Sequence, residues 1–142
     1  MKQIAESICI VDDDGDDRQI IQDAFRQTGT SAEIASFENG NALIDHLKEL
    51  GSNQLPSLIL LDLNMLGKDG RELLQEIKSI NNFRHIPIII FTTSSSDHDR
   101  TNCYALGANC FVTKPSAYNK LVESIQSISK LWLSDALVRS PS

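Results

Sequence analysis

Short apolar runs along the chain alternate with longer segments in which apolar residues recur every three or four positions. Because side chains repeat with a period of two in a strand and 3.6 in a helix, the runs predict strands and the longer segments predict helices. We expect strands over 7–11, 33–37, 57–61, 87–91 and 109–113. We expect helices over 16–28, 40–50, 70–80, 97–106 and 116–133. The alternation predicts an α/β fold, a doubly wound parallel sheet of five strands flanked by five helices.

The polarity of each run indicates where its strand lies in the sheet. Residues 58–61 and 88–91 are continuously apolar, as strands covered on both faces should be, so we place them inside the sheet. Residues 33–37 alternate instead, which favours an edge strand. Glycines follow three of the predicted helices, where a left-handed residue commonly closes the last turn. They are Gly29, Gly51 and Gly107.

Length and composition indicate one ordinary globular domain. The chain has 142 residues, of which 41% are apolar and 23% charged. We expect the domain to span 1–133, with 134–142 as a C-terminal tail. The net charge of -6 argues against direct nucleic-acid binding, which usually needs a basic face. No apolar run approaches the roughly 20 residues of a membrane span, and the first residues lack the apolar core of a signal peptide, so we expect a cytoplasmic protein.

The three cysteines lack the spacing of metal ligands, and we interpret them as structural. Cys9 and Cys110 fall within predicted strands, where a free cysteine behaves as a small buried hydrophobe. We expect Cys103 to be the more accessible one.

Polar residues stand where four of the predicted strands end. Asp12 and Asp13 follow the first strand, Asp62 the third, Thr92 the fourth and Lys114 the fifth. The carboxyl ends of parallel strands share one edge of the sheet, and ligands bind in the crevice outside that edge, so these groups should converge. Clustered carboxylates repel one another unless a cation neutralises them, and oxygen ligands suit Mg²⁺. We therefore expect a site for magnesium and a phosphoryl group.

Asp62 is the residue most suited to direct chemistry. A carboxylate after a buried strand is well placed to attack an electrophile, and an aspartate can form a covalent aspartyl phosphate. The alternative is a helix-capping aspartate, but Asp69 is the better candidate to begin the following helix. Asp14 and Asp16 are similarly interpreted as capping residues of the first helix.

The other polar groups have matching roles. Asp12 and Asp13 would hold the metal directly or through water, together with Asp62 and a main-chain carbonyl at Asn64. A strand-end lysine is most often a surface charge, yet Lys114 is poised beside these acids, where an ammonium would pair with Asp62 and with a transferred phosphoryl group. Thr92 could simply be a β-forming residue before a turn, or it could donate its hydroxyl.

Five segments in order make the chain resemble the receiver domain of two-component response regulators, particularly the small stand-alone type. The resemblance runs from about Ser7 to Trp132. The matching segments are Ile10-Val11-Asp12-Asp13, Leu60-Leu61-Asp62-Leu63-Asn64 with Lys68-Asp69-Gly70, Ile86-Pro87-Ile88-Ile89-Ile90-Phe91-Thr92-Thr93-Ser94, Leu106-Gly107-Ala108-Asn109, and Phe111-Val112-Thr113-Lys114-Pro115. The resemblance implies the flavodoxin-like strand order 2-1-3-4-5, of which receiver domains are themselves an example.

The resemblance also implies roles for individual residues. Asp62 corresponds to the phosphoacceptor, Asp12 and Asp13 to the acidic pair that holds magnesium, and Asn64 to the source of a metal-binding carbonyl. Thr92 and Lys114 correspond to the groups that bind phosphoryl oxygens.

Phe111 corresponds to an aromatic switch that turns inward as Thr92 moves toward the phosphate. The Lys114-Pro115 bond is expected to be cis, as is usual in the family. One departure is Leu66 followed by Gly67, where the family commonly has proline four residues after the phosphoacceptor.

The family implies a signalling switch and not a metabolic enzyme. A sensor histidine kinase or phosphotransfer protein would phosphorylate Asp62, catalysis would be limited to self-phosphorylation and slow autodephosphorylation, and an unknown downstream protein would contact residues of the last two helices and the strand between them. One alternative is a magnesium-dependent phosphohydrolase of the haloacid-dehalogenase type, but Asn64 stands where such enzymes need a second aspartate. Another is a receiver-like adaptor that works without phosphorylation.

The last predicted helix has more apolar residues than one face can bury. Leu121, Ile125, Ile128 and Trp132 form a stripe that should cover the sheet. Further apolar residues lie off this stripe or beyond it, namely Val122, Leu131, Leu133, Ala136 and Leu137. We expect this surplus to form a homodimer interface, with folding back onto the chain's own surface as the alternative.

Overall fold

The computed structural model describes residues 6–133, in which five helices surround one parallel sheet. The predicted tail, with Ala136 and Leu137, lies outside the described residues. Each predicted element is present, with ends that differ from the prediction by no more than two residues. The strands are β1 (Ser7–Val11), β2 (Glu33–Phe37), β3 (Leu58–Leu61), β4 (Ile88–Thr92) and β5 (Cys110–Thr113). The helices are α1 (Gly15–Gln27), α2 (Gly40–Glu49), α3 (Gly70–Ser79), α4 (Asp97–Ala105) and α5 (Tyr118–Trp132).

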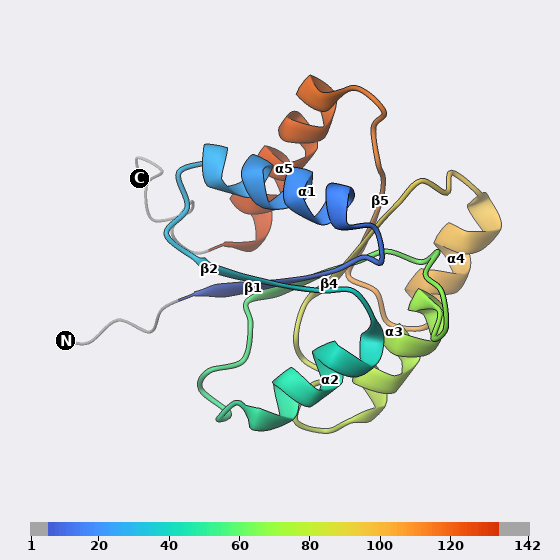
Figure 1. Ribbon diagram of the computed structural model, residues 1–142. Coiled ribbons are helices and arrows are strands. Elements are labelled where there is room, and N and C mark those ends of the chain that lie inside the picture. Colours follow the sequence, from blue (N-terminus) through green and yellow to red (C-terminus); the bar gives the residue numbers. More distant parts are fainter. Residues whose placement is uncertain (1–5, 134–142) are drawn as a thin grey trace.

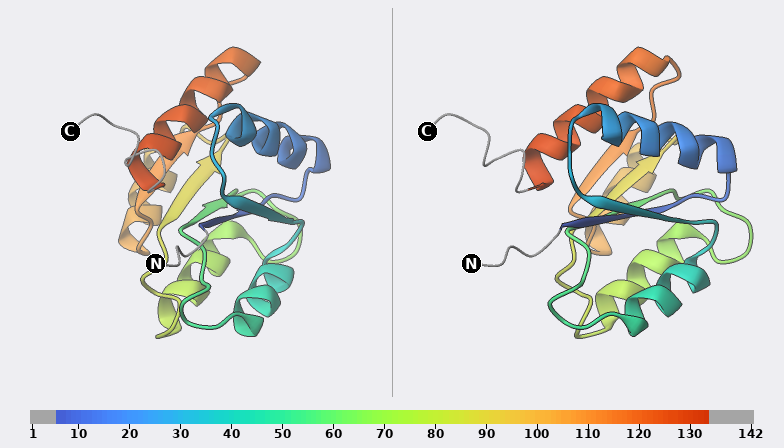
Figure 2. Two further views of the ribbon diagram at one scale, coloured as in Figure 1. Left: turned by 90° about the vertical axis from the view of Figure 1, so that its left-hand side faces the viewer. Right: turned by 60° about the vertical axis from the view of Figure 1, so that its left-hand side comes forward.

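The sheet has the strand order β2-β1-β3-β4-β5, and all four pairings are parallel. The alternating strand β2 is at an edge, and the continuously apolar strands β3 and β4 are inside the sheet, as their polarity predicts. Figures 1 and 2 show the sheet between two layers of helices, with α1 and α5 on one face and α2 and α3 on the other.

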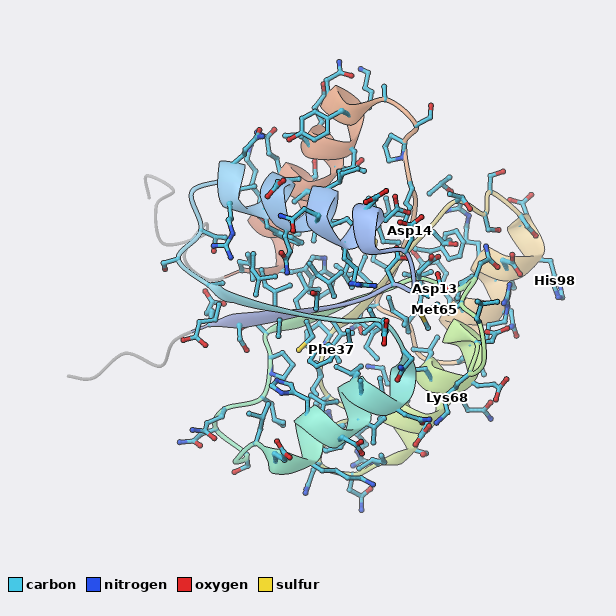
Figure 3. The ribbon with its side chains drawn as sticks, in the orientation of Figure 1. Asp13, Asp14, Phe37, Met65, Lys68 and His98 are labelled. Atoms are coloured by element: carbon cyan, nitrogen blue, oxygen red, sulfur yellow. The ribbon has the colours of Figure 1, made fainter. Side chains whose placement is uncertain are left out.

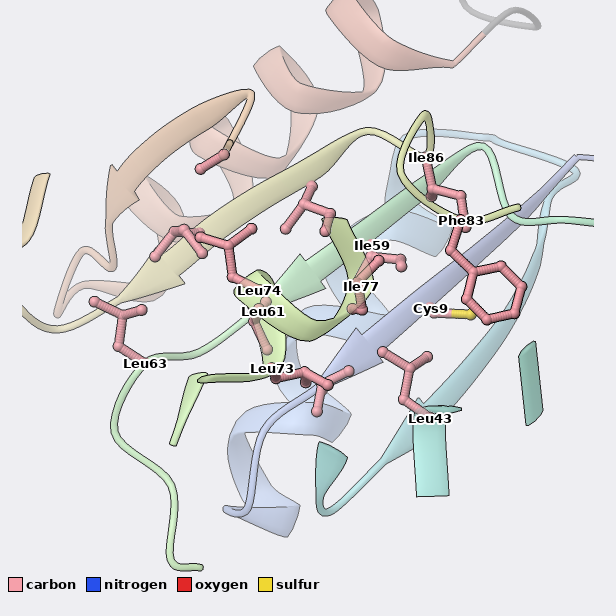
Figure 4. Packing of buried hydrophobic residues seen from close by; sticks show 14 of the residues in the cluster. Cys9, Leu43, Ile59, Leu61, Leu63, Leu73, Leu74, Ile77, Phe83 and Ile86 are labelled. Atoms are coloured by element: carbon pink, nitrogen blue, oxygen red, sulfur yellow. The ribbon is translucent and has the colours of Figure 1, made fainter. Parts of the chain in front are cut away.

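Two apolar clusters, one on each face, hold these layers together. Alternate residues of each strand point to opposite faces, so Ile59 and Leu61 of β3 enter one cluster while Leu58 and Leu60 enter the other. Figure 4 shows the first cluster, in which α3 packs on the strands. Cys103 also belongs to this cluster and is fully buried, so the expectation that it is accessible is wrong. The reason is that it lies on the inner face of α4, and its burial raises the pKa of its thiol.

Two further expectations about the backbone need correction. Gly29 and Gly107 have positive φ angles of 79° and 107°, as predicted for residues that close a helix. Gly51 does not, because α2 ends with Leu50 in an extended conformation. The described residues contain no cis peptide bond, so Lys114-Pro115 is trans. The trans form is the favoured isomer of X-Pro bonds in general, by about 0.5–1 kcal/mol.

The end of α5 folds onto the body of the protein. Leu133 is fully buried in the cluster beneath α1 and α5, and Trp132 packs against the same cluster. Leu131 is 70% exposed. Of the surplus apolar residues that suggested an interface, Leu133 and the partly buried Val122 are therefore taken up by the chain's own core.

Candidate functional site

The strands of the sheet deliver acidic residues to its carboxyl edge. Asp12 follows β1 and Asp62 follows β3. The two residues lie side by side because the Asp62 amide donates to the Val11 carbonyl at 3.0 Å. One oxygen from each of Asp12, Asp13 and Asp62 lies within 4.8 Å of the others. Figure 3 shows Asp13 and Met65, from the loops after β1 and β3, at the same edge of the sheet. The structure thus brings together the three carboxylates that the sequence placed at a metal site.

Burial of these carboxylates in their charged form is energetically unfavourable unless a cation lies nearby. Asp12 is 1% exposed and Asp62 is 7% exposed. Burial raises the pKa of Asp12 above its ordinary value, while the hydrogen bond from Lys114 opposes that rise. Because a buried carboxylate is stabilised only by nearby donors or cations, the cluster favours binding of a positive charge.

Lys114 supplies one positive charge from the end of β5. Its Nζ atom lies 2.7 Å from Asp12 Oδ2, 3.0 Å from Asp17 Oδ2 and 3.4 Å from Asp62 Oδ2. Burial by itself would lower the pKa of Lys114, but the hydrogen bond with Asp12 and the charges of Asp62 and Asp12 outweigh it and raise the pKa. The ammonium is therefore fully protonated at neutral pH and lies next to the Asp62 carboxylate.

The sequence did not single out Asp17, which the structure places at the site. It is in the first turn of α1, one turn before the buried Ile21, so the helical period places it on the face that turns toward the sheet. The neighbouring Arg18 donates from Nη1 to the Asp12 carbonyl at 2.7 Å and so braces the acidic loop. Both could have been found by following the helical period of α1 back to its first turn.

The loop after β3 closes over the site. Asp69 caps α3 by accepting from the Arg71 amide, as predicted, and the Gly70 amide donates to the Leu63 carbonyl at 3.0 Å. The Leu66 amide donates to Asp13 Oδ2 at 2.9 Å, which fixes the position of that carboxylate. The Leu66 side chain is 86% exposed. Proline has no amide hydrogen, so the residue that replaces the family's proline gives Asp13 a backbone donor that proline could not supply.

Asp62 itself is held weakly. Its Oδ1 atom accepts from the Asn64 amide at 3.4 Å, and its Oδ2 atom faces Lys114 at the same distance. Asn64 is exposed at the start of this loop. A carboxylate with two long contacts keeps lone pairs free for a metal or an electrophile.

Thr92 and Phe111 are close to the site on the neighbouring strands. Thr92 ends β4, is completely buried, and pairs in register with Thr113, the residue before Lys114. Its Oγ1 atom accepts from the Ser94 amide at a long 3.5 Å. Phe111 is 4% exposed, so its ring occupies an inward position.

The three histidines lie away from the carboxylate cluster. His85 and His98 are exposed, and Figure 3 shows His98 on the outer side of α4. His46 is half-buried, with its ring 5.0 Å from the ring of Phe37.

The arrangement defines the class of protein. It is a flavodoxin-like α/β domain with three carboxylates, a lysine and a buried threonine assembled at the carboxyl edge of its sheet. Oxygen ligands from carboxylates are those that magnesium and similar hard cations prefer, so the donor set fits such an ion. With Asp17 the site has four acids against the two cations Lys114 and Arg18, so a divalent cation would balance the remaining charge.

Comparison with known proteins agrees with this class. The family model of the response regulator receiver domain matches residues 8–126. The chain is 34% identical over 129 residues to response regulator Rcp1 of a Synechocystis species, covering 89% of this chain and 88% of that protein. It is also 34% identical to the probable methanogenesis regulatory protein FilR2 of Methanothrix harundinacea, over 89% of this chain and 83% of that protein.

Solved structures give the same result. The phosphorylated cyanobacterial phytochrome response regulator RcpA matches with a TM-score of 0.83 and 34% identity, over 93% of this chain and 96% of that one. The Mn²⁺-bound form of Rcp1 matches with a TM-score of 0.81 and 33% identity, over 96% of this chain and 99% of that one.

The chain belongs to the response regulator receiver family. It is therefore a signalling domain of two-component systems and not a metabolic enzyme, and the phosphohydrolase alternative gains no support. None of the helices within residues 6–133 is long and apolar enough to cross a membrane.

Proposed function

We propose that this protein is a cytoplasmic phosphorylation switch in which Asp62 accepts a phosphoryl group from a histidine kinase or a phosphotransfer protein. The observation that carries the proposal is the position of Asp62, nearly buried, beside two further carboxylates and within 3.4 Å of the Lys114 ammonium. The proposed receiver domain spans 1–133 and contains the whole matched region.

In this proposal Asp12, Asp13 and Asp62 would hold Mg²⁺, with a main-chain carbonyl at Asn64. Magnesium, when bound, supplies charge neutralisation for the carboxylates and for the incoming phosphoryl group. Asp13 is already oriented by the Leu66 amide, and Asp12 by Lys114 and the Asp14 amide.

The transfer itself needs little from the protein beyond positioning. An Asp62 carboxylate oxygen forms the new bond to phosphorus while the phosphorus–nitrogen bond of the donor phosphohistidine breaks, and the imidazole nitrogen regains its proton from solvent. Lys114 binds an oxygen of the transferred group, and Thr92 donates its hydroxyl to another. The added negative charge pulls Thr92 and Lys114 into a second arrangement that alters Phe111 and the surface of α4, β5 and α5.

The direct test is phosphorylation by a small phosphodonor with and without magnesium. We expect intact mass spectrometry to show one added phosphoryl group when Mg²⁺ is present and almost none when the metal is removed by a chelator, because the clustered carboxylates repel the incoming anion. A receiver-like adaptor that works without phosphorylation would stay unmodified in both conditions.

We also propose that the protein forms a homodimer through α4, β5 and α5. The support is a set of large apolar side chains that remain exposed on these helices, with Leu131 at 70%, Tyr118 at 49% and Tyr104 at 45%. Single exposed apolar residues are common on monomers, and Tyr118 and Leu131 lie near opposite ends of α5, so the interface is tested at Leu131, the most exposed of the three.

Sedimentation of the phosphorylated protein tests the dimer. We expect a dimer at tens of micromolar, and we expect Leu131→Gln to shift it toward monomer because it removes an exposed apolar contact. Leu66→Gln is the matched control, since Leu66 is equally apolar and 86% exposed but lies in the loop after β3. A monomeric wild-type protein, or equal effects of the two substitutions, would contradict the proposed interface.

A further inference from the structure

Helix α4 contacts the loop that follows Thr92. The Ser94 hydroxyl donates to Asp99 Oδ2 at 2.7 Å and accepts from the Ser96 amide at 3.2 Å. Asp99 Oδ1 accepts from Arg71 Nη2 of α3 at 2.6 Å. The hydrogen bond from Arg71 and then that from Ser94 lower the pKa of Asp99, so this carboxylate is ionised at neutral pH. The first turn of α4 is thus fixed both to the Thr92 loop and to α3.

The same helix holds Phe111 at two points. The Arg100 guanidinium lies over the Phe111 ring, with its central carbon 4.9 Å from the ring centroid. The Phe111 amide donates to the Tyr104 hydroxyl at 3.0 Å. This amide belongs to β5, an edge strand that pairs on one side with β4 and, within residues 6–133, has no strand on its other side. The hydroxyl of Tyr104 in α4 therefore satisfies a backbone donor that faces away from the sheet.

These contacts form a closed path between the loop and the ring. Asp99 and Arg100 are consecutive residues, so α4 cannot move relative to Ser94 without moving the guanidinium that covers Phe111. Strand β5 closes the path on the other side, since the Thr113 hydroxyl donates to the Ser94 carbonyl at 2.8 Å. In Figure 1 α4 lies beside β5 and α3, at the edge of the sheet.

We propose that Arg100 and Tyr104 are positioning residues that hold Phe111 inward and thereby couple the Asp62 site to the outer face of α4. The inference rests on the proposed phosphorylation of Asp62. If binding at Asp62 favours the inward ring, then contacts that favour the inward ring must strengthen binding at Asp62 to the same degree, because coupling between sites is reciprocal. Weakening the Arg100 contact therefore weakens the binding of a phosphoryl-like anion.

The test is the affinity of the magnesium-loaded protein for beryllium trifluoride, which mimics the phosphoryl group. We expect Arg100→Gln to weaken this affinity by about two- to fivefold, the range expected for loss of a partly exposed cation–π contact. Tyr104→Phe keeps the ring but removes the hydroxyl acceptor, and we expect it to weaken binding in the same direction. Arg84→Gln is the charge-matched control, because Arg84 is exposed on the turn after α3, and we expect it to leave the affinity unchanged.

A double-mutant cycle separates the proposed coupling from a general loss of charge. In a Phe111→Leu background the guanidinium has no aromatic face to cover, so Arg100→Gln should no longer change the affinity. A second readout needs no ligand: the ring resonances of Phe111, identified by their loss in Phe111→Leu, should shift in Arg100→Gln and not in Arg84→Gln.

The outcomes distinguish this inference from the proposed function. Wild-type affinity or tighter binding in Arg100→Gln, or an effect that persists in the Phe111→Leu background, would overturn the positioning role while Asp62 phosphorylation still stood. Failure of the wild-type protein to bind the anion at all would overturn the proposed function, and unshifted Phe111 resonances in Arg100→Gln would then reject the positioning role separately.

Discussion

Asp62→Asn should abolish phosphorylation by small phosphodonors. An amide oxygen is a far poorer nucleophile than a carboxylate. Among the three clustered carboxylates Asp62 has the longest contacts, since Asp12 lies 2.7 Å from Lys114 Nζ and Asp13 accepts from the Leu66 amide at 2.9 Å. We expect intact mass spectrometry to show no added phosphoryl group in the variant under conditions that label the wild-type protein. Asp45→Asn, which changes an exposed aspartate of α2, is the matched control and should be labelled normally.

The Asp62→Asn variant should also remain folded. Within residues 6–133 the Asp62 side chain accepts two long hydrogen bonds of 3.4 Å, and removal of its charge relieves repulsion with Asp12 and Asp13. We therefore expect a urea midpoint at or above that of the wild-type protein. Normal labelling of this variant would show that another residue is the phosphoacceptor.

Gly70→Ala should cause the largest loss of stability among single substitutions near the site. A methyl group at this position would overlap the Asp62 carbonyl oxygen and would lie 2.7 Å from Leu63 Cα and 3.0 Å from the Asp62 carbonyl carbon. These are backbone atoms that cannot turn aside as a side chain can. We expect a loss of about 2–3 kcal/mol in the free energy of unfolding, measured by urea titration.

Gly15→Ala is the matched control for this substitution. Both glycines are the first residue of a helix, but the nearest atom to a methyl group at Gly15 is Arg18 Nη2 at 3.4 Å, at the end of a flexible side chain. We expect this variant to retain wild-type stability within about 1 kcal/mol. Equal stability of the two variants would contradict the close approach of α3 to the backbone of Asp62.

The sequence predicts the sheet well because its strands carry strong and different patterns. Continuous apolar runs identify β3 and β4 as inner strands, and the alternation of 33–37 identifies β2 as an edge strand. Asp12, Asp62 and Lys114 could be expected to meet because each directly follows a strand of one parallel sheet. The local sequence pattern and the sheet topology are sufficient to predict that these three side chains converge.

The features that the sequence did not predict depend on which way a helix faces. Asp17 reaches Lys114 because α1 turns its first turn toward the sheet edge, and Cys103 is buried because α4 presents that side to the core. The contacts of Asp99 with Arg71 and of Arg100 with Phe111 join residues that are distant in sequence. Such pairings are set by the packing angle of α4, which no local period encodes.

Two errors have similar physical causes. Gly51 follows α2, but the chain leaves this helix in an extended conformation at Leu50, so no left-handed residue is needed there. Leu133 looks like surplus apolar surface in the sequence, yet the end of α5 lies over the cluster and buries it. The conformation of the chain after the helix thus determines both whether Gly51 must be left-handed and whether Leu133 is buried.

The most direct measurement is the chemical identification of the phosphorylated residue. The protein is labelled with a small phosphodonor in the presence of Mg²⁺ and then treated with borohydride, which reduces an aspartyl phosphate to homoserine. Peptide mass spectrometry then locates the homoserine. We expect it at position 62 and nowhere else. Homoserine at position 12, 13 or 17, or a labelled protein that yields none, would contradict the assignment of Asp62 as the phosphoacceptor.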